Sequence, residues 1–341
     1  MTAEPLNMEQ GELPPLTFLV EWENAQDVEM MWTERAMRGL AEEIRRNHGA
    51  FGRKPKLMYL YDQGKVKEGD IRACIQRIAP ELGTLTDLEL VPTPGLTYYR
   101  LKNEGARRAT TPFIVMVDSD AAPQPGWLMG LMKPFADPEI QGVAGFTTLG
   151  HKDVLSRTMA LCWIFDLPSE RARTATRRTV HANNCAFRTD FFRANPWPEV
   201  KGSFKKACGF WAREMDRRGV NWVRTAEAVT IHAPQPGHLF LVWRAWIGGT
   251  DRDYHGAFRK GFSRWRRARF AFKFWCKKMV RSTCRILSKG HEVDLKPWQM
   301  PLALFYAWSY YTICFVSQMF SALTRTYEGA PEYAGPASPK A

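Results

Sequence analysis

Hydrophobic and polar positions follow two different periods along roughly the first 235 residues. Short apolar runs predict buried strands at residues 16–20, 56–61, 88–91, 113–117 and 141–146. Between these runs, apolar residues recur at helical spacing and predict helices at residues 30–45, 67–78, 99–109 and 127–135. Strands and helices that alternate at this spacing are typical of a doubly wound α/β sheet flanked by helices. Ligands of such sheets bind at the carboxyl ends of the strands.

The second half of the chain is less regular. Strand-like pieces at 181–187 and 221–231 surround a predicted helix at 204–218, which a glycine, Gly219, ends. A basic amphipathic helix is then predicted at 258–286. The 28 residues from 297 to 324 carry no charge, which is long enough to cross about 30 Å of hydrocarbon. Three alternatives stay open for this last segment: it spans a membrane, lies in its surface, or packs on the protein.

The chain is basic, and its excess charge is local. Its 341 residues hold 48 Lys and Arg against 35 Asp and Glu, a net charge of +13. Residues 254–290 contain twelve Lys and Arg and no acidic residue, so the rest of the chain is nearly neutral. Such a segment binds an anionic membrane, binds nucleic acid, or is a solvated helix. Interleaved aromatic residues favour the anionic membrane surface, and no nucleic acid is expected because no recognised nucleic-acid module is present.

Two carboxylates follow the most apolar predicted strand. Asp118 and Asp120 come directly after residues 113–117, and Asp62 similarly follows the strand at 56–61. Carboxylates one residue apart on a turn can hold Mg²⁺ or Mn²⁺, which stabilises charge on a departing nucleoside diphosphate. The alternative is that Asp118 and Asp120 only cap the following helix.

The surrounding residues resemble those of a known family. The stretch at 99–128, YRLKNEGARRATTPFIVMVDSDAAPQPGWL, is similar to the pattern of family-two glycosyltransferases, which have the GT-A fold. Further similarity lies in NNCAFR at 183–188 and in the helix, strand and histidine that end at His232. The resemblance covers residues 16–232, about two thirds of the chain. It implies a mixed sheet and a nucleotide-diphosphate sugar as donor substrate.

The resemblance also implies roles for individual residues. Asp120 is the expected principal metal ligand and a catalytic residue, Asp118 holds the metal or the ribose, and His232 completes the metal or diphosphate shell. The residues expected around the nucleotide are Glu23, Asn24, Asp62, Lys102 and Asn103. The residues expected to line the sugar or acceptor pocket are Asn183 and Asn184.

The sequence departs from the family where the general base is expected. The usual acidic pair falls at Ala207 and Cys208, and an inverting transfer needs a base within reach of the acceptor hydroxyl. Our hypothesis for this base is Glu199, with Glu214 as the next carboxylate downstream. The loss also leaves open an alternative function, that of a catalytically impaired nucleotide-sugar-binding partner in a glycan-assembly complex.

These patterns together predict five segments: a flexible tail (1–15), a GT-A-like domain (16–235), a basic amphipathic segment (236–296), a membrane-associated or spanning helix (297–325) and a second tail (326–341). The first fifteen residues hold three Glu and no Lys or Arg, unlike a secretory signal. We therefore expect a membrane-associated glycosyltransferase at the cytoplasmic face of the inner or plasma membrane. Its expected acceptor is a lipid-linked or envelope glycan.

Overall fold

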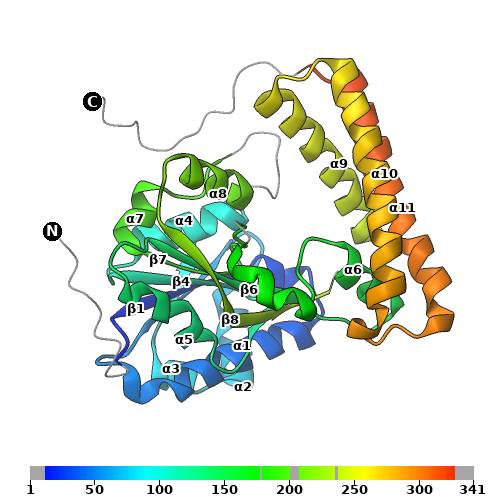
Figure 1. The fold of residues 1–341 in the computed structure, drawn as a ribbon. Helices are drawn as coiled ribbons and strands as arrows, with labels where there is room; N and C mark the ends of the chain where they lie inside the picture. Colours follow the sequence, from blue (N-terminus) through cyan, green and yellow to red (C-terminus); the bar gives the residue numbers. More distant parts are fainter. Residues whose placement is uncertain (1–11, 177–178, 200–206, 235–236, 327–341) are drawn as a thin grey trace, which may run out of the picture.

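The computed structural model describes residues 12–176, 179–199, 207–234 and 237–326. They form an α/β body with an arm of three long helices beside it (Figure 1). The strands are β1 (Leu16–Glu21), β2 (Lys56–Tyr61), β3 (Asp87–Pro92), β4 (Phe113–Asp118), β5 (Ala121–Pro123), β6 (Gly142–Leu149), β7 (Asn184–Arg188) and β8 (Trp222–His232). The helices of the body are α1 (Met30–Arg46), α2 (Glu68–Ile78), α3 (Leu82–Leu85), α4 (Tyr98–Arg108), α5 (Trp127–Met132), α6 (Val154–Cys162), α7 (Thr189–Ala194) and α8 (Ala207–Arg217). The arm consists of α9 (His238–Lys260), α10 (Arg264–Lys289) and α11 (Met300–Thr324).

All eight described strands form one mixed sheet in the order β3-β2-β1-β4-β7-β6-β8-β5. The first half, from β3 to β4, is parallel, whereas β7 runs antiparallel to both β4 and β6. Helices α1, α2, α3 and α5 bury one face of this sheet, and α4, α7 and α8 bury the other. The predicted α/β fold with a mixed sheet is therefore confirmed, and the strands at 16–20, 56–61 and 113–117 lie where the apolar runs placed them.

The sheet order brings three strand ends together. Strand β1 pairs with β4 so that Glu21 lies beside Asp118 at the carboxyl edge. The last residue of β8, His232, pairs with Ala121, the residue that follows Asp120. A crossing backbone hydrogen bond, from the Ala233 amide to the Asp120 carbonyl (2.8 Å), fixes this junction. Residues that are far apart in the sequence thus meet at the edge where ligands of α/β sheets bind.

The prediction that one basic helix begins at residue 258 is wrong. The chain instead forms α9 up to Lys260 and begins α10 at Arg264, with a left-handed Gly261 (φ 57°) between them. The hydrophobic periodicity did not predict α9, because glycines interrupt the apolar pattern of this helix. A Cβ at Gly249 would lie 2.3 Å from the Cys314 carbonyl oxygen of α11, so only glycine permits this approach of the two helices.

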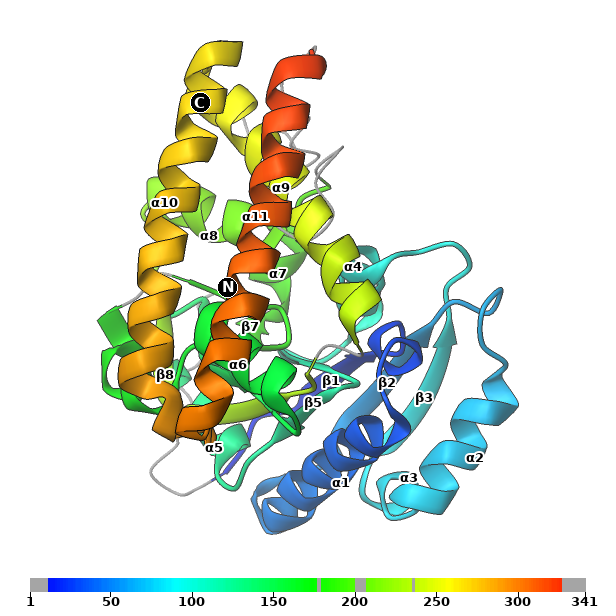
Figure 2. The same cartoon turned by 90° about the vertical axis from the view of Figure 1, so that its right-hand side faces the viewer.

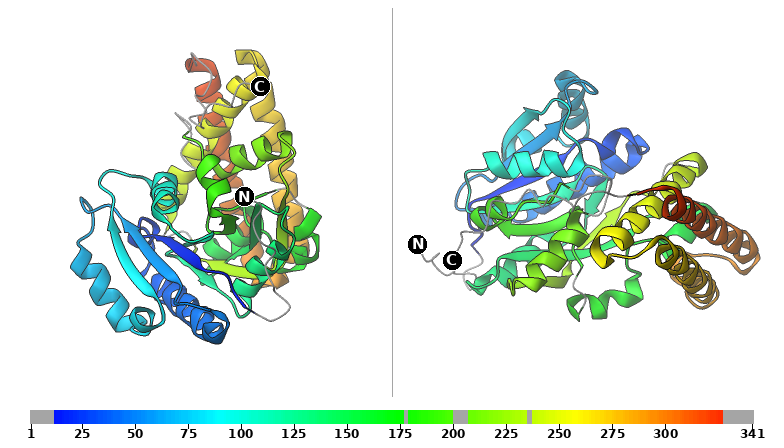
Figure 3. Two further views of the ribbon diagram at one scale, coloured as in Figure 1. Left: turned by 90° about the vertical axis from the view of Figure 1, so that its left-hand side faces the viewer. Right: turned by 90° about the horizontal axis from the view of Figure 1, so that it is seen from above.

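The three helices of the arm lie together at one side of the body (Figure 3). One side of α11 packs against α9 and α10 and against α6, through Ala303, Ala307 and Tyr311. The Tyr311 hydroxyl donates a hydrogen bond to the Cys162 carbonyl at the end of α6. In the described part of the chain, α11 included, no helix has both the length and the apolar composition needed to cross a membrane.

The two predicted tails are only partly described. Residues 1–11 and 327–341 lie outside the described residues. Leu13, which the sequence placed in the first tail, is buried, and its backbone amide bonds the Ala50 carbonyl at 2.7 Å. The ordered body therefore begins before the first strand.

Candidate active site

Asp118 and Asp120 lie buried at the carboxyl edge of the sheet. Strand β4 is apolar up to Val117 and fully buried, so it carries the two carboxylates into the middle of the protein. Each of them is 3% exposed. Buried carboxylates need hydrogen-bond donors or a cation, and the neighbouring elements supply both kinds of partner.

Asp118 is held by three donors from other elements. Lys102 of α4 places its Nζ 2.5 Å from Asp118 Oδ1, and the Tyr98 hydroxyl lies 2.8 Å from Oδ2. From the end of β1, Asn24 Nδ2 donates to the same Oδ2 at 3.1 Å. Both carboxylate oxygens of Asp118 are therefore already engaged by the protein, which fixes the position of this side chain.

Asp120 faces His232 across a short gap. Their Oδ2 and Nε2 atoms are 3.6 Å apart, which is too long for a hydrogen bond. The other ring nitrogen of His232, Nδ1, lies 2.8 Å from the Ala233 carbonyl, which can only accept a hydrogen bond. The neutral form of the ring that fits this contact carries its proton on Nδ1 and leaves the lone pair of Nε2 for a metal ion. Asp118, Asp120 and His232 each offer a ligand atom within 4.8 Å of the others.

This set of donors fits a divalent cation. Two carboxylates and one imidazole suit Mn²⁺ or Mg²⁺, and the hydrogen bond on the far ring nitrogen orients a histidine ligand as metal sites usually do. The structure thus brings together the three residues that the sequence analysis grouped as metal ligands. Because Asp118 is bound by Lys102 and Tyr98, Asp120 and His232 are the better placed direct ligands.

Glu21 moderates the negative charge of the site. It is fully buried beside Asp118, and burial together with the Asp118 charge raises its pKa to about 8. At neutral pH most of Glu21 is therefore protonated, and its Oε2 accepts a hydrogen bond from the Asn24 backbone amide at 3.0 Å. This bond fixes the turn that aims the Asn24 side chain at both aspartates.

A cavity of about 110 Å³ opens onto the two aspartates and His232. On its floor and walls are Asn24, Asn183, Tyr98 and Cys208, and Arg244 of α9 enters from the arm. Burial lowers the pKa of the Arg244 guanidinium, so an anionic partner there would be favoured. Arg244 thus adds a positive charge to a cavity that also holds the two aspartates.

Cys208 occupies the position where the sequence comparison expects a catalytic carboxylate. Its thiol lines the cavity and accepts a hydrogen bond from the Tyr99 hydroxyl at 3.3 Å. Burial raises the pKa of Cys208, so the thiol stays protonated at neutral pH. The hypothetical base Glu199 lies elsewhere: it is exposed, forms an ion pair with Arg100 at 3.0 Å and does not line the cavity.

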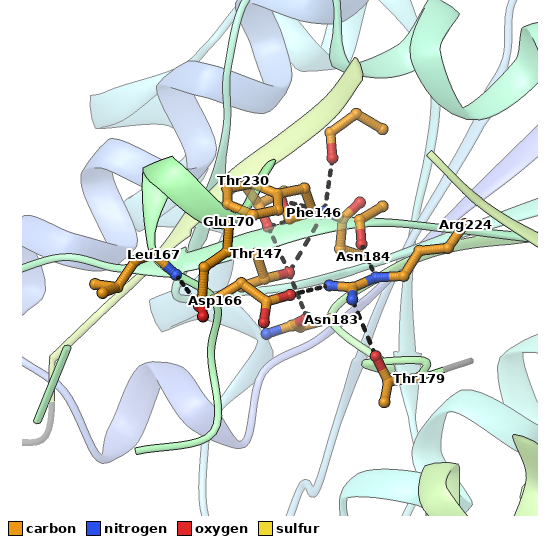
Figure 4. Close-up of polar contacts among 12 residues, drawn as sticks. Phe146, Thr147, Asp166, Leu167, Glu170, Thr179, Asn183, Asn184, Arg224 and Thr230 are labelled. Atoms are coloured by element: carbon orange, nitrogen blue, oxygen red, sulfur yellow. Dashed lines mark hydrogen bonds and ion pairs between the residues drawn. The ribbon is translucent and has the colours of Figure 1, made fainter. Parts of the chain in front are cut away.

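Asn183 and Asn184 differ in what their side chains do. Asn183 lines the cavity and receives a hydrogen bond from Thr147. Asn184 is fully buried, and its Nδ2 donates to the carbonyl of Phe146 (Figure 4). Its side chain also accepts from Trp127 Nε1 and donates to the Ala228 carbonyl. Contrary to expectation, Asn184 therefore supports the sheet instead of lining a substrate pocket.

The remaining residues expected around the nucleotide lie away from the cavity walls. Asp62 closes a turn, and the hydrogen bonds from the amides of Gly64 and Gly95 lower its pKa. Asn103 donates from Nδ2 to the Trp197 carbonyl and accepts from the Trp197 backbone amide through Oδ1, and Glu23 lies 3.9 Å from Lys65. Lys102 is fully buried beneath Asp118, so it is placed to position that carboxylate.

Sequence reasoning did not assign Tyr98, Arg244 or His181 to the site. Tyr98 begins α4, directly before the stretch that carried the family resemblance. Arg244 lies in α9, which the periodicity did not predict. His181 lines the cavity, and burial lowers its pKa to about 4, so it is neutral at physiological pH.

Comparison with known proteins agrees with this geometry. Residues 87–195 match the family model described as glycosyl transferase family 2. This matched third of the chain is a glycosyltransferase family 2 domain. This finding confirms the resemblance seen in the sequence, and it assigns the domain to the nucleotide-sugar glycosyltransferases. A search of curated proteins gave no match.

The glycosyltransferase domain also resembles solved structures. A mannosyltransferase from Pyrobaculum calidifontis, in complex with GDP-Man and Mn²⁺, matches with a TM-score of 0.53 and 17% identity, over 90% of this chain and 88% of that chain. GalNAc-T7 with UDP, GalNAc and Mn²⁺ matches with a TM-score of 0.47 and 10% identity, over 72% of this chain and 50% of that chain. At this level of identity the first match shows a shared GT-A-like fold.

Proposed function

We propose that this glycosyltransferase transfers a sugar from a metal-bound nucleoside-diphosphate sugar to a glycan or lipid-linked acceptor at a membrane surface. The part of this proposal that concerns the sugar donor, here called the donor half, rests on one observation. Asp120 and His232 face each other beside a cavity that Arg244 also enters. Mg²⁺ or Mn²⁺ held there would stabilise negative charge on the departing diphosphate. Asn24, Tyr98 and Lys102 keep Asp118 in place, and Arg244 would contact the diphosphate oxygens.

The donor half is tested by metal-dependent hydrolysis of nucleotide sugars. Mn²⁺ and GDP-Man are the first ligands to try, because the P. calidifontis mannosyltransferase was solved with them. We expect Asp120→Asn to abolish Mn²⁺ binding and hydrolysis while the fold is kept. The matched control is Asp27→Asn, which changes a carboxylate of the same cavity outside the metal group. Equal hydrolysis by Asp120→Asn and wild-type protein would contradict the assignment.

The part of the proposal that concerns the membrane rests on exposed apolar side chains of α10 and α11. Exposed apolar side chains recur along α11 with the period of a helix, and α10 also carries exposed apolar side chains. They are Leu302, Phe305, Trp308, Val316, Phe320 and Leu323 on α11, and Trp265, Phe272, Val280 and Leu287 on α10. The two helices lie side by side (Figure 2), joined by hydrogen bonds from Trp308 to Thr283 and from Trp275 to Thr312.

These side chains suit a helix pair that lies in a membrane surface. An apolar row on α11 would enter the lipid boundary, and exposed cations of α10 would attract anionic headgroups. These cations are Arg264, Arg266, Arg269, Lys273 and Lys277, and α10 has no acidic residue. The positive charge favours the cytoplasmic leaflet. Flotation with anionic liposomes tests this proposal; binding to DNA without binding to such liposomes would contradict it.

A second candidate function is a nucleotide-sugar-binding partner without turnover. Cys208 favours it, because a protonated thiol stands where the family comparison expects a carboxylate. Tight, metal-dependent nucleotide binding without hydrolysis or transfer, across a panel of donors and acceptors, would favour this alternative over the enzyme.

A further inference from the structure

A second cavity of about 280 Å³ adjoins the candidate active site. It lies between the segment that follows α6 and the inner face of α10 and α11. The two cavities share one wall, formed by Trp163, Ile164, Phe165 and His181. The Phe165 ring lies 4.9 Å from the ring of His232 and 5.1 Å from that of His181, so this wall reaches the proposed metal ligand. The donor chemistry proposed above makes no use of this second cavity.

Three cations of α10 line the second cavity. Lys278, Arg281 and Arg285 are spaced at i, i+3 and i+7, which places them on one side of the helix. In the part of the chain that the structure describes, neither Lys278 nor Arg281 forms an ion pair with a carboxylate. The Lys278 Nζ instead lies over the rings of Phe274 and Tyr311, 5.5 and 5.2 Å from their centres.

The carboxylates near this cavity are already engaged. Asp166 lies 2.7 Å from Arg224, which also bonds Thr179 of the cavity wall (Figure 4). Glu170 lies 3.1 Å from one nitrogen of Arg285, whereas the buried Nε of Arg285 has no hydrogen-bond partner among the described residues. The cavity therefore retains more positive than negative charge, together with a buried donor that is unsatisfied.

Such a cluster costs stability unless an anion neutralises it. Burial, together with the charges of Arg252 and Arg281, lowers the pKa of Lys278 to about 8, so the ammonium is partly desolvated yet still mostly charged at neutral pH. Phosphate oxygens are the usual partners of Lys and Arg in this arrangement, since they accept several charge-assisted hydrogen bonds at once.

We propose that this cavity binds a phosphate group of the acceptor. The inference deepens the proposed function, because it rests on sugar transfer at the adjacent metal site and names the acceptor class as a phosphate ester. The phosphate would contact Lys278, Arg281 and Arg285, and the sugar-accepting group of the same molecule would reach past the shared wall toward Asp120. The ester is either a lipid phosphate that enters from the membrane-facing helices or a water-soluble phosphate.

Binding calorimetry on the full chain with EDTA tests the cavity apart from the metal site. The ligands are geranyl phosphate, as a lipid phosphate of short chain, and inorganic phosphate. The variants are Lys278→Gln with Arg281→Gln and, as a matched control, Lys273→Gln with Lys277→Gln. The control removes the same charge from exposed positions of α10 that do not line the cavity.

We expect the cavity variant to bind geranyl phosphate at least about tenfold more weakly than wild type, and the control to change affinity less than about twofold. Tighter binding of geranyl phosphate than of inorganic phosphate identifies the source as a lipid; equal binding identifies a soluble phosphate. The inference is overturned if wild-type protein binds neither ligand, or if both double variants weaken binding equally.

The single variant Arg281→Gln guards against misfolding, because Arg281 is exposed and its loss leaves the packing intact. It is expected to weaken phosphate binding in the same direction as the double variant. Metal-dependent donor hydrolysis should survive in all these variants. Loss of hydrolysis in Asp120→Asn tests the proposed function separately, so the two ideas can fail independently.

Discussion

Lys102 and Asp118 form an ion pair that is shielded from water, with Nζ and Oδ1 2.5 Å apart. Lys102 also donates to the Ala182 carbonyl at 2.7 Å, which links α4 to the segment before β7. The pair lies directly beneath the proposed metal site. It therefore holds one aspartate of the site in place and neutralises its charge.

We expect Lys102→Met to destabilise the protein by about 3–5 kcal/mol, because it leaves a buried carboxylate without its cation. Urea unfolding followed by tryptophan fluorescence measures this loss. The double variant Lys102→Met with Asp118→Asn should regain part of the stability, since it removes the uncompensated charge. If the double variant is less stable than Lys102→Met alone, the ion pair does not explain the effect.

The metal site predicts a specific role for His232. His232→Gln should weaken Mn²⁺ binding by at least about tenfold. Even substitution of residues that only hydrogen-bond a metal ligand commonly lowers metal affinity by about 10- to 100-fold. Titration with Mn²⁺, followed by electron paramagnetic resonance, measures the unbound metal. Asp27→Asn serves as the control and should bind Mn²⁺ like wild type. An unchanged affinity in His232→Gln would remove His232 from the metal group.

The sequence was informative where the backbone alone decides position. The apolar run ending at Val117 placed Asp118 and Asp120 at a strand end, and the sheet order then brought His232 to them. Sequence spacing says nothing about which hydrogen bonds a side chain has already made. Asn184 and Lys102 were therefore expected to face a ligand, whereas the fold uses both of them internally.

Contacts between the arm and the body were also hidden from sequence reasoning. Arg244 reaches the cavity only because α9 packs against α11, and that packing depends on the close approach at Gly249. A glycine within a helix lowers the periodic signal that predicts one. The arm also places Lys278 and Arg281 at the wall of the second cavity, whereas the basic composition of α10 suggested only an outer surface.

The membrane proposal predicts a loss of liposome binding from three exposed side chains of α11. In Leu302→Ser with Phe305→Ser and Val316→Ser, the fraction that floats with phosphatidylglycerol liposomes should fall at least about tenfold, because each buried apolar side chain contributes about 1.5–3 kcal/mol. The control is Met30→Ser with Met31→Ser, two exposed apolar residues of the body. Equal flotation of the triple variant and this control would contradict a role for α11.

The phosphate cavity predicts a pH dependence that belongs to Lys278. The pKa of Lys278 is about 8, so its charge changes between pH 6 and 9. Two other groups of the cavity titrate outside this range, because burial lowers the pKa of His181 to about 4 and raises that of Cys162 to about 12. The other cations that face Lys278 are Arg252, Arg281 and Arg285. Burial raises the pKa of Tyr311 well above this range. The neighbouring carboxylates, Asp166 and Glu170, are paired with Arg224 and Arg285.

An anion binds the charged form of Lys278, which predominates below pH 8 and is lost above it. Sulfate is the probe, because its own charge is constant over the range. Its affinity should be level from pH 6 to 7 and fall toward about tenfold weaker by pH 9, as linkage to one group with this pKa requires. Lys278→Arg should keep the binding and lose the pH dependence, since guanidinium does not titrate there. If Lys278→Arg shows the same decline as wild type, another group controls the anion site.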